Sequence, residues 1–157
     1  MDFAKAIECL SKVKPDHYSD FCIGNLMVNR SLSSPAWDRQ PDPVDDCPPT
    51  QLVTKNMKLE YCKLIMDIEA QYKAASGDDK RALAYQLAVM YHNATHWGGC
   101  WYLTHYYWSV YDEPDDIYTA FENKALKYLT EAAESGDGRV KSKALYAKTW
   151  MLDSRAP

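Results

Sequence analysis

The chain has 157 residues, of which 46% are hydrophobic, 25% are charged and 13% are aromatic, as is ordinary for one globular domain. Eighteen basic and 22 acidic residues give a net charge of −4, which argues against the basic footprint of a nucleic-acid-binding protein. No apolar run approaches the roughly 18 residues of a membrane span, and the N-terminus does not resemble a signal peptide.

Two helices and a long loop are predicted in the N-terminal third. In residues 2–13 the apolar side chains recur at helical spacing, and Pro15 ends that pattern. The apolar stretch Tyr18–Val28 is also expected to be helical, which places the N-terminal helices within residues 1–32. Residues 33–50 hold five of the eight prolines, so they predict a Pro-rich loop that serves as a linker, a lid or a packed excursion.

Residues 51–157 predict a series of amphipathic helices. Apolar side chains recur at helical spacing in four stretches, and an aromatic helix is expected over residues 101–111. The four stretches are residues 57–72, 79–94, 117–132 and 140–151. No segment keeps the alternation of a β-strand between turn signals. The prediction is therefore a single all-α domain, residues 1–157, built as an antiparallel array of about five to seven helices.

The same turn sequence occurs twice, as Ser76-Gly77-Asp78 and as Ser135-Gly136-Asp137, each after a long amphipathic helix. Such self-similarity is typical of repeat architectures, in which neighbouring helix pairs bury each other's faces. We expect both glycines to end a helix with a positive φ angle, where a Cβ atom would be costly. The aspartate that follows each glycine is expected to cap the next helix.

The spacing of small and large side chains in these helices resembles the tetratricopeptide repeat (TPR). The matching positions are Ala84, Leu87, Ala88 and Tyr91 in a first helix, Ala125, Leu129 and Ala132 in a second, and Tyr146, Ala147 and Trp150 in the next first helix. Asp137 departs from the pattern, because proline is usual there, and the repeat is longer than the ordinary unit of about 34 residues. The resemblance implies a divergent TPR-like right-handed superhelix over residues 51–157.

Residues 56–62 and 84–106 resemble large helical-repeat proteins of gut Bacteroidetes, which contain a YxNxTxxG segment followed by W-x-L-T-x-Y. Residues 6–18 resemble a helix end found upstream in the same proteins. The resemblance implies an exported or envelope-associated protein of which this chain is a fragment. It supplies no catalytic residue.

One set of side chains could carry chemistry. His92, His96 and Cys100 are spaced i, i+4 and i+8, and histidines at i and i+4 of a helix can chelate a metal. Residues 93–95 lack the glutamate of the zincin motif, and the Gly98-Gly99 pair is expected to turn Cys100 away. We therefore expect packed histidines, no cofactor and no catalysis, with a metal protein or enzyme that uses these three residues as the alternative.

Aromatic residues are concentrated between Trp97 and Tyr111, where they either complete the core or form a partly exposed binding stripe. A binding surface is expected there and on the inner face of residues 79–94. The candidate binding residues are Trp97, Trp101, Tyr102, Tyr106, His92, His96 and His105. The sequence therefore predicts a non-catalytic protein-interaction or scaffold module of a larger bacterial envelope protein, with a protein or peptide partner.

Overall fold

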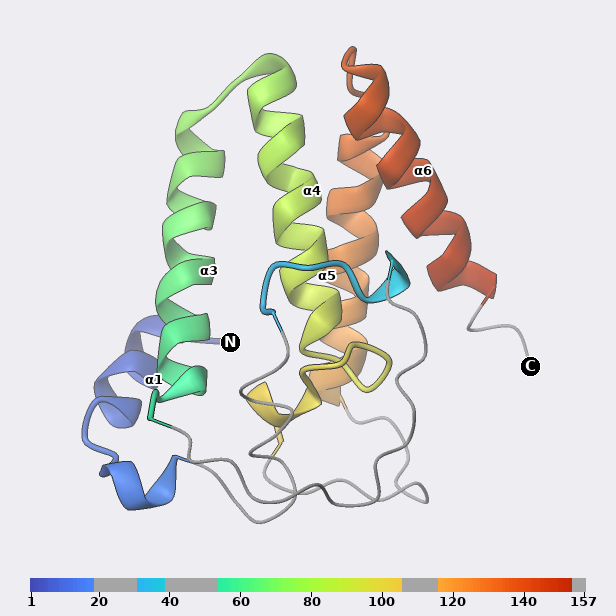
Figure 1. Cartoon of the computed structure of the whole chain (residues 1–157). Coiled ribbons are helices and arrows are strands. Elements are labelled where there is room, and N and C mark those ends of the chain that lie inside the picture. Colours follow the sequence, from blue (N-terminus) through green and yellow to red (C-terminus); the bar gives the residue numbers. More distant parts are fainter. Residues whose placement is uncertain (19–30, 39–53, 106–115, 154–157) are drawn as a thin grey trace.

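The computed structural model describes residues 1–18, 31–38, 54–105 and 116–153, and in these ranges it contains helices and no strand (Figure 1). The α-helices are α1 (Phe3–Leu10), α3 (Met57–Ala74), α4 (Gly77–Asn93), α5 (Asp116–Ala132) and α6 (Gly138–Asp153). Short 3-10 turns are η1 (Pro15–His17), η2 (Ala36–Asp38) and η3 (Trp101–Leu103). The all-α prediction is thus confirmed for the described residues. No helix within them is long and apolar enough to cross a membrane.

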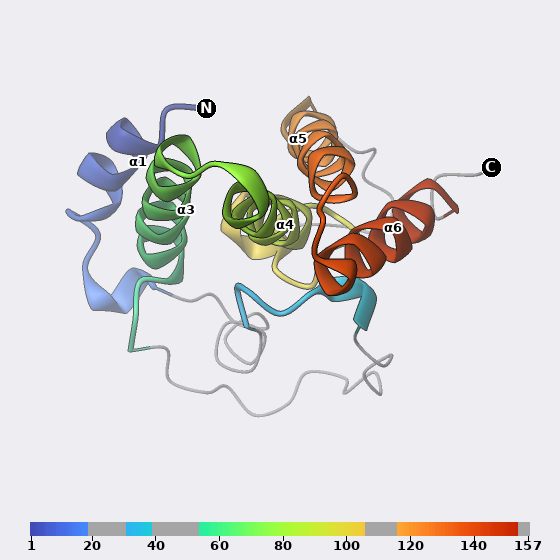
Figure 2. The same cartoon turned by 90° about the horizontal axis from the view of Figure 1, so that it is seen from above.

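Helix α4 lies at the centre of an antiparallel array. It packs against α3 on one side and α5 on the other, and α6 packs on α5 and also contacts α4. Helix α1 covers the outer side of α3, so that α1 and α6 lie at opposite edges of the array (Figure 2). The C-terminal half of α4 is buried on every face, from Leu87 to Asn93, because neighbours surround it.

The buried faces of α5 and α6 follow the predicted periodicity. In α5 the buried stripe contains Phe121, Ala125, Leu129 and Ala132, and in α6 it contains Ala144, Ala147 and Met151. Alanines at these contacts let two helix backbones approach closely. The stripe of α5 begins at Tyr118 rather than at Ile117, which is exposed.

The two Ser-Gly-Asp turns differ in conformation. Gly77 has a φ angle of +59°, as predicted, but it is the first residue of α4 rather than a cap of α3. The prediction for Gly136 is wrong, because Gly77 is the one glycine with positive φ among the described residues. The backbone N–H of Gly136 instead donates to the Asp78 carboxylate at 2.8 Å. The second turn is therefore stabilised by a side chain of α4.

The predicted aromatic helix over residues 101–111 is wrong for residues 101–105, where the chain forms only the 3-10 turn η3. The hydroxyl of Thr104 donates to the carbonyls of Ala94 (2.9 Å) and Trp101 (3.1 Å), and these bonds close a compact turn. Residues 106–111 lie outside the described residues, as do most of the predicted helix at 18–28 and of the Pro-rich loop.

Candidate functional site

Side chains at and just after the C-terminal end of α4 contact the backbone of the short segment that leads into η2. Asn93 donates from Nδ2 to the backbone carbonyls of Leu32 (3.0 Å) and Ser34 (2.8 Å). The thiol of Cys100 lies 3.9 Å from the carbonyl oxygen of Ser31. The Asn93 amide and the Cys100 thiol, which the sequence offered as a possible metal ligand, thus fix one segment of the chain onto another.

Trp37 of this segment and His92 of α4 form a buried aromatic cluster. The Trp37 indole N–H donates to the Tyr85 hydroxyl at 3.3 Å. The His92 ring lies 5.3 Å from the Trp37 ring and 5.5 Å from the Trp150 ring of α6, measured between centroids. Both Trp37 and His92 are buried. His92 is therefore a core residue that joins α4 to η2 and α6, and it faces no solvent from which a ligand could come.

A second aromatic cluster lies where α5 begins. His105 stacks on Tyr118 with 4.3 Å between ring centroids, and His96 meets Tyr118 edge-on at 6.0 Å. Burial lowers the pKa of His96, and the negative charge of Glu122 opposes this shift. Trp97 contacts His96 at 4.7 Å and leaves 49% of its surface exposed. A His96 ring whose pKa is lowered by burial and that packs on aromatic faces suits a structural role.

The three residues suggested as metal ligands point to different surroundings. His92 lies between two tryptophans, and His96 lies against Tyr118. The Cys100 thiol faces a backbone carbonyl. Within the described ranges, no group of three or more His, Cys, Asp or Glu side chains is arranged to hold a metal ion.

The predicted binding residues that the structure describes differ in their exposure. Trp97 is exposed, Trp101 is partly buried and Tyr102 is fully buried. Tyr106 lies outside the described residues. The expectation of a binding stripe along this segment stays a prediction.

A polar network centred on Tyr91 joins three helices, and the sequence pattern gave no sign of it. The Tyr91 hydroxyl donates to Glu69 of α3 at 2.6 Å and accepts from Lys124 of α5 at 2.9 Å. The Lys124 ammonium also lies 4.6 Å from the centroid of the Tyr91 ring. Burial and the neighbouring Glu69 carboxylate raise the pKa of Tyr91 well above its usual range. Tyr91 therefore stays neutral and bridges opposite charges, which stabilises the array.

Tyr72 connects α3 to α5 nearer the other end of the array. Its hydroxyl donates to the Glu131 carboxylate at 2.6 Å, and its ring meets Tyr128 edge-on at 5.3 Å. Lys80 lies over the same ring at 4.7 Å. Burial and the bond to Glu131 raise the pKa of Tyr72 to about 12. Helical spacing placed Tyr72 on the apolar face but gave no sign of its partner.

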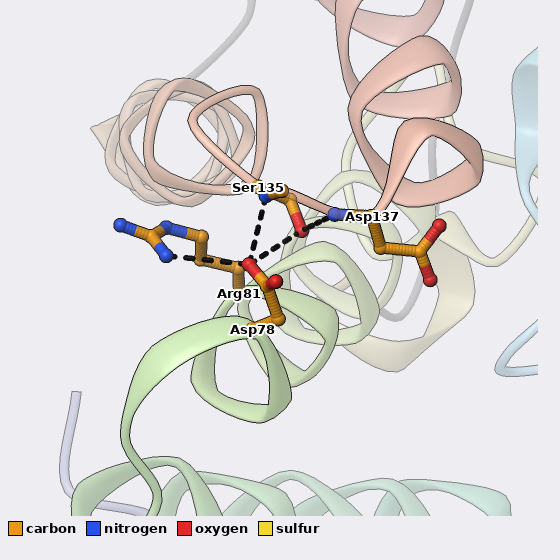
Figure 3. A network of polar contacts seen from close by, with 5 residues as sticks. Asp78, Arg81, Ser135 and Asp137 are labelled. Atoms are coloured by element: carbon orange, nitrogen blue, oxygen red, sulfur yellow. Dashed lines mark hydrogen bonds and ion pairs between the residues drawn. The ribbon is translucent and has the colours of Figure 1, made fainter.

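The two repeated turns contact each other directly (Figure 3). One oxygen of the Asp78 carboxylate accepts from the Gly136 N–H at 2.8 Å and from the Ser135 hydroxyl at 3.1 Å. Arg81, one turn further along α4, donates to the same oxygen at 3.3 Å. These bonds lower the pKa of Asp78. Asp137 caps α6 as predicted, because its side chain accepts from the Arg139 N–H at 2.8 Å.

Exposed apolar side chains gather on α6. Three of the seven large hydrophobic residues exposed in the described ranges belong to this helix. They are Leu145, Tyr146 and Leu152, which expose 47%, 55% and 50% of their surface. Helix α6 lies at the edge of the array, so nothing among the described residues covers this side (Figure 2).

Comparisons with models of protein families, with curated proteins and with solved structures give no match to this chain. The class of protein is therefore defined by the structure alone. In the described residues it is an all-α array in which clusters of polar side chains connect helices and turns to each other. One surface feature of the described residues that these internal contacts leave unexplained is the exposed side of α6.

Proposed function

We propose that this chain is a non-catalytic protein-interaction or scaffold module, built as a TPR-like right-handed superhelix. The contacts among α4, α5 and α6 support this assignment. Helix α5 packs against both of its neighbours, and α4 also contacts α6, as first helices of consecutive repeats do. The bonds from Asp78 to the second Ser-Gly-Asp turn connect the corresponding turns of the two units.

The observation that carries the interaction role is the group of exposed apolar side chains on α6. A soluble surface rarely gathers large apolar side chains on one element unless something binds there. The alternative, a metal protein or enzyme using His92, His96 and Cys100, has no comparable support, because their side chains face different partners. The proposal includes that this chain is part of a larger envelope-associated protein of Bacteroidetes. The sequence resemblance alone supports this part.

An unbiased peptide display selection against the purified full chain tests this function. The proposal predicts a convergent peptide motif that binds with micromolar affinity, after counter-selection on the bare support has removed matrix-binding sequences. The metal content of the same preparation should be well below one ion per chain. Failure to recover any convergent peptide, or a stoichiometric metal ion lost on His96→Ala, would contradict the proposal.

A further inference from the structure

Helix α6 is basic in an acidic chain. It carries four cations, Arg139, Lys141, Lys143 and Lys148, against one carboxylate, Asp153, whereas the whole chain has a net charge of −4. The ion pairs formed among the described residues lie in and beside α1, in α3 and in α4. None of the four cations takes part in them. Their charge is therefore available to a partner.

Two of these cations share a stripe with the exposed leucines. Lys141, Leu145, Lys148 and Leu152 follow the spacing i, i+4, i+7 and i+11, which places them on one side of the helix. The stripe borders the buried one that faces α5 and α4. Each leucine exposes about half of its surface. We call these four residues the α6 stripe.

The α6 stripe alternates a positive charge with an aliphatic side chain along the helix axis. The two leucines are seven residues apart, which corresponds to about 10 Å along the axis. A partner helix with apolar residues at i and i+7 and carboxylates between them would place apolar groups on the leucines and negative charges beside the lysines. Opposite charges across such a contact set the choice of partner.

We propose that the α6 stripe binds an acidic amphipathic peptide segment of a partner protein. This inference rests on the proposed interaction function and names the surface and the partner chemistry. A symmetric pairing of α6 with α6 of a second copy would gather the lysines of both stripes in one interface with no stripe carboxylate to balance them, which is unfavourable. The charge of the stripe therefore favours an acidic partner over self-association.

The test uses a fluorescein-labelled helical peptide of about two heptads, with Leu at i and i+7 and Glu at the flanking positions. A matched peptide has Gln in place of Glu. Fluorescence anisotropy with the full chain at low salt should show binding of the Glu peptide, about tenfold weaker binding of the Gln peptide, and weakening with added salt.

Two double variants locate the binding surface. Lys141→Glu with Lys148→Glu, and Leu145→Ser with Leu152→Ser, should each weaken binding about tenfold. The matched control is Lys73→Glu with Met66→Ser on α3, whose side chains are also exposed, and it should leave binding unchanged. Because all these side chains except Lys148 are exposed, every variant should keep the helical circular dichroism signal.

Several results would overturn the inference. One is that the Glu peptide does not bind, or that the Glu and Gln peptides bind equally well. Another is that the α3 variant weakens binding as much as the α6 variants do. A third is that the chain binds phosphatidylserine vesicles or single-stranded DNA more tightly than it binds the Glu peptide. Concentration-dependent dimerisation that is lost in the leucine variant would also overturn it. If displayed peptides bind but are not acidic, this inference fails while the interaction function stands. If no peptide binds at all, both fail.

Discussion

Among the described residues Gly77, Gly98, Gly136 and Gly138, Gly98 is the glycine where one added methyl group should do most damage. It is buried against the last turn of α4, and its N–H donates to the Thr95 carbonyl at 3.0 Å. A Cβ atom built on Gly98 would overlap the carbonyl oxygen of His92 and the Cα and carbonyl oxygen of Asn93. All of these are backbone atoms of the helix end, so no side-chain rotation can relieve the overlap.

The cost of Gly98→Ala follows from these contacts. Inserting a methyl group into a well-packed site costs about 1–3 kcal/mol. Moving the loop away from α4 would also strain the hydrogen bond from the Cys100 N–H to the Asn93 carbonyl, which is 2.9 Å long and worth about 1 kcal/mol. We therefore expect Gly98→Ala to lower the free energy of unfolding by about 2–4 kcal/mol.

Two other glycines provide matched comparisons in urea unfolding followed by circular dichroism. A Cβ atom at Gly138 meets nothing within 4 Å, so Gly138→Ala should change stability by no more than about 1 kcal/mol and should favour the helix. Gly77→Ala should cost about 1 kcal/mol because of its φ angle of +59°. If Gly98→Ala unfolds with the same midpoint and slope as Gly138→Ala, the steric reasoning is refuted.

Three further predictions concern the polar contacts. Because its hydrogen bonds lower the pKa of Asp78, the folded state gains stability from its carboxylate above about pH 4 and loses it in more acidic solution. Asp78→Asn should therefore lower the urea midpoint at neutral pH, with the difference from wild type shrinking in acid. Absorbance titration should show Tyr72 ionising near pH 12, and Glu131→Gln should lower this value. The stabilisation from this raised pKa is complete below about pH 10 and is lost as the pH rises through the folded value. Tyr91→Phe should cost about 1.5–3 kcal/mol in urea unfolding, because it removes a hydroxyl bonded to two charged groups, whereas Tyr146→Phe on the exposed side of α6 should cost less than about 0.5 kcal/mol.

Hydrophobic periodicity was sufficient to predict the long helices and much of their buried faces. The apolar positions of α3 and α4 recur at helical spacing, and the structure buries Ile65, Ile68, Leu87 and Met90 as that spacing requires. The alanines at positions 84 and 88 are fully buried, in agreement with a small-residue face that a neighbour approaches closely.

Contacts between distant segments could not be predicted from local patterns. Nothing in the periodicity indicates that Asp78 bonds to Gly136 or that Asn93 holds the carbonyl of Ser34. The two repeated turns share a sequence, yet only Gly77 needs the left-handed conformation. A glycine in a turn can be required by its φ angle or by an approaching side chain, and the sequence does not distinguish the two causes.

The burial of the candidate binding residues also could not be predicted from local sequence patterns. His92 and Tyr102 have the composition of a ligand site, but the fold buries them. The basic and apolar character of α6 is visible in its sequence. Its exposure depends on which helices pack beside it, and this becomes known only from the arrangement in space.

Mapping the bound acidic peptide on the full chain by amide chemical shifts tests the interaction account most directly. The account predicts that the largest shifts occur at Lys141, Leu145, Lys148 and Leu152, while the indole N–H signal of Trp97 stays unchanged. A footprint centred on Trp97 and η3, with α6 unaffected, would contradict the account and would place the binding surface on the aromatic segment instead.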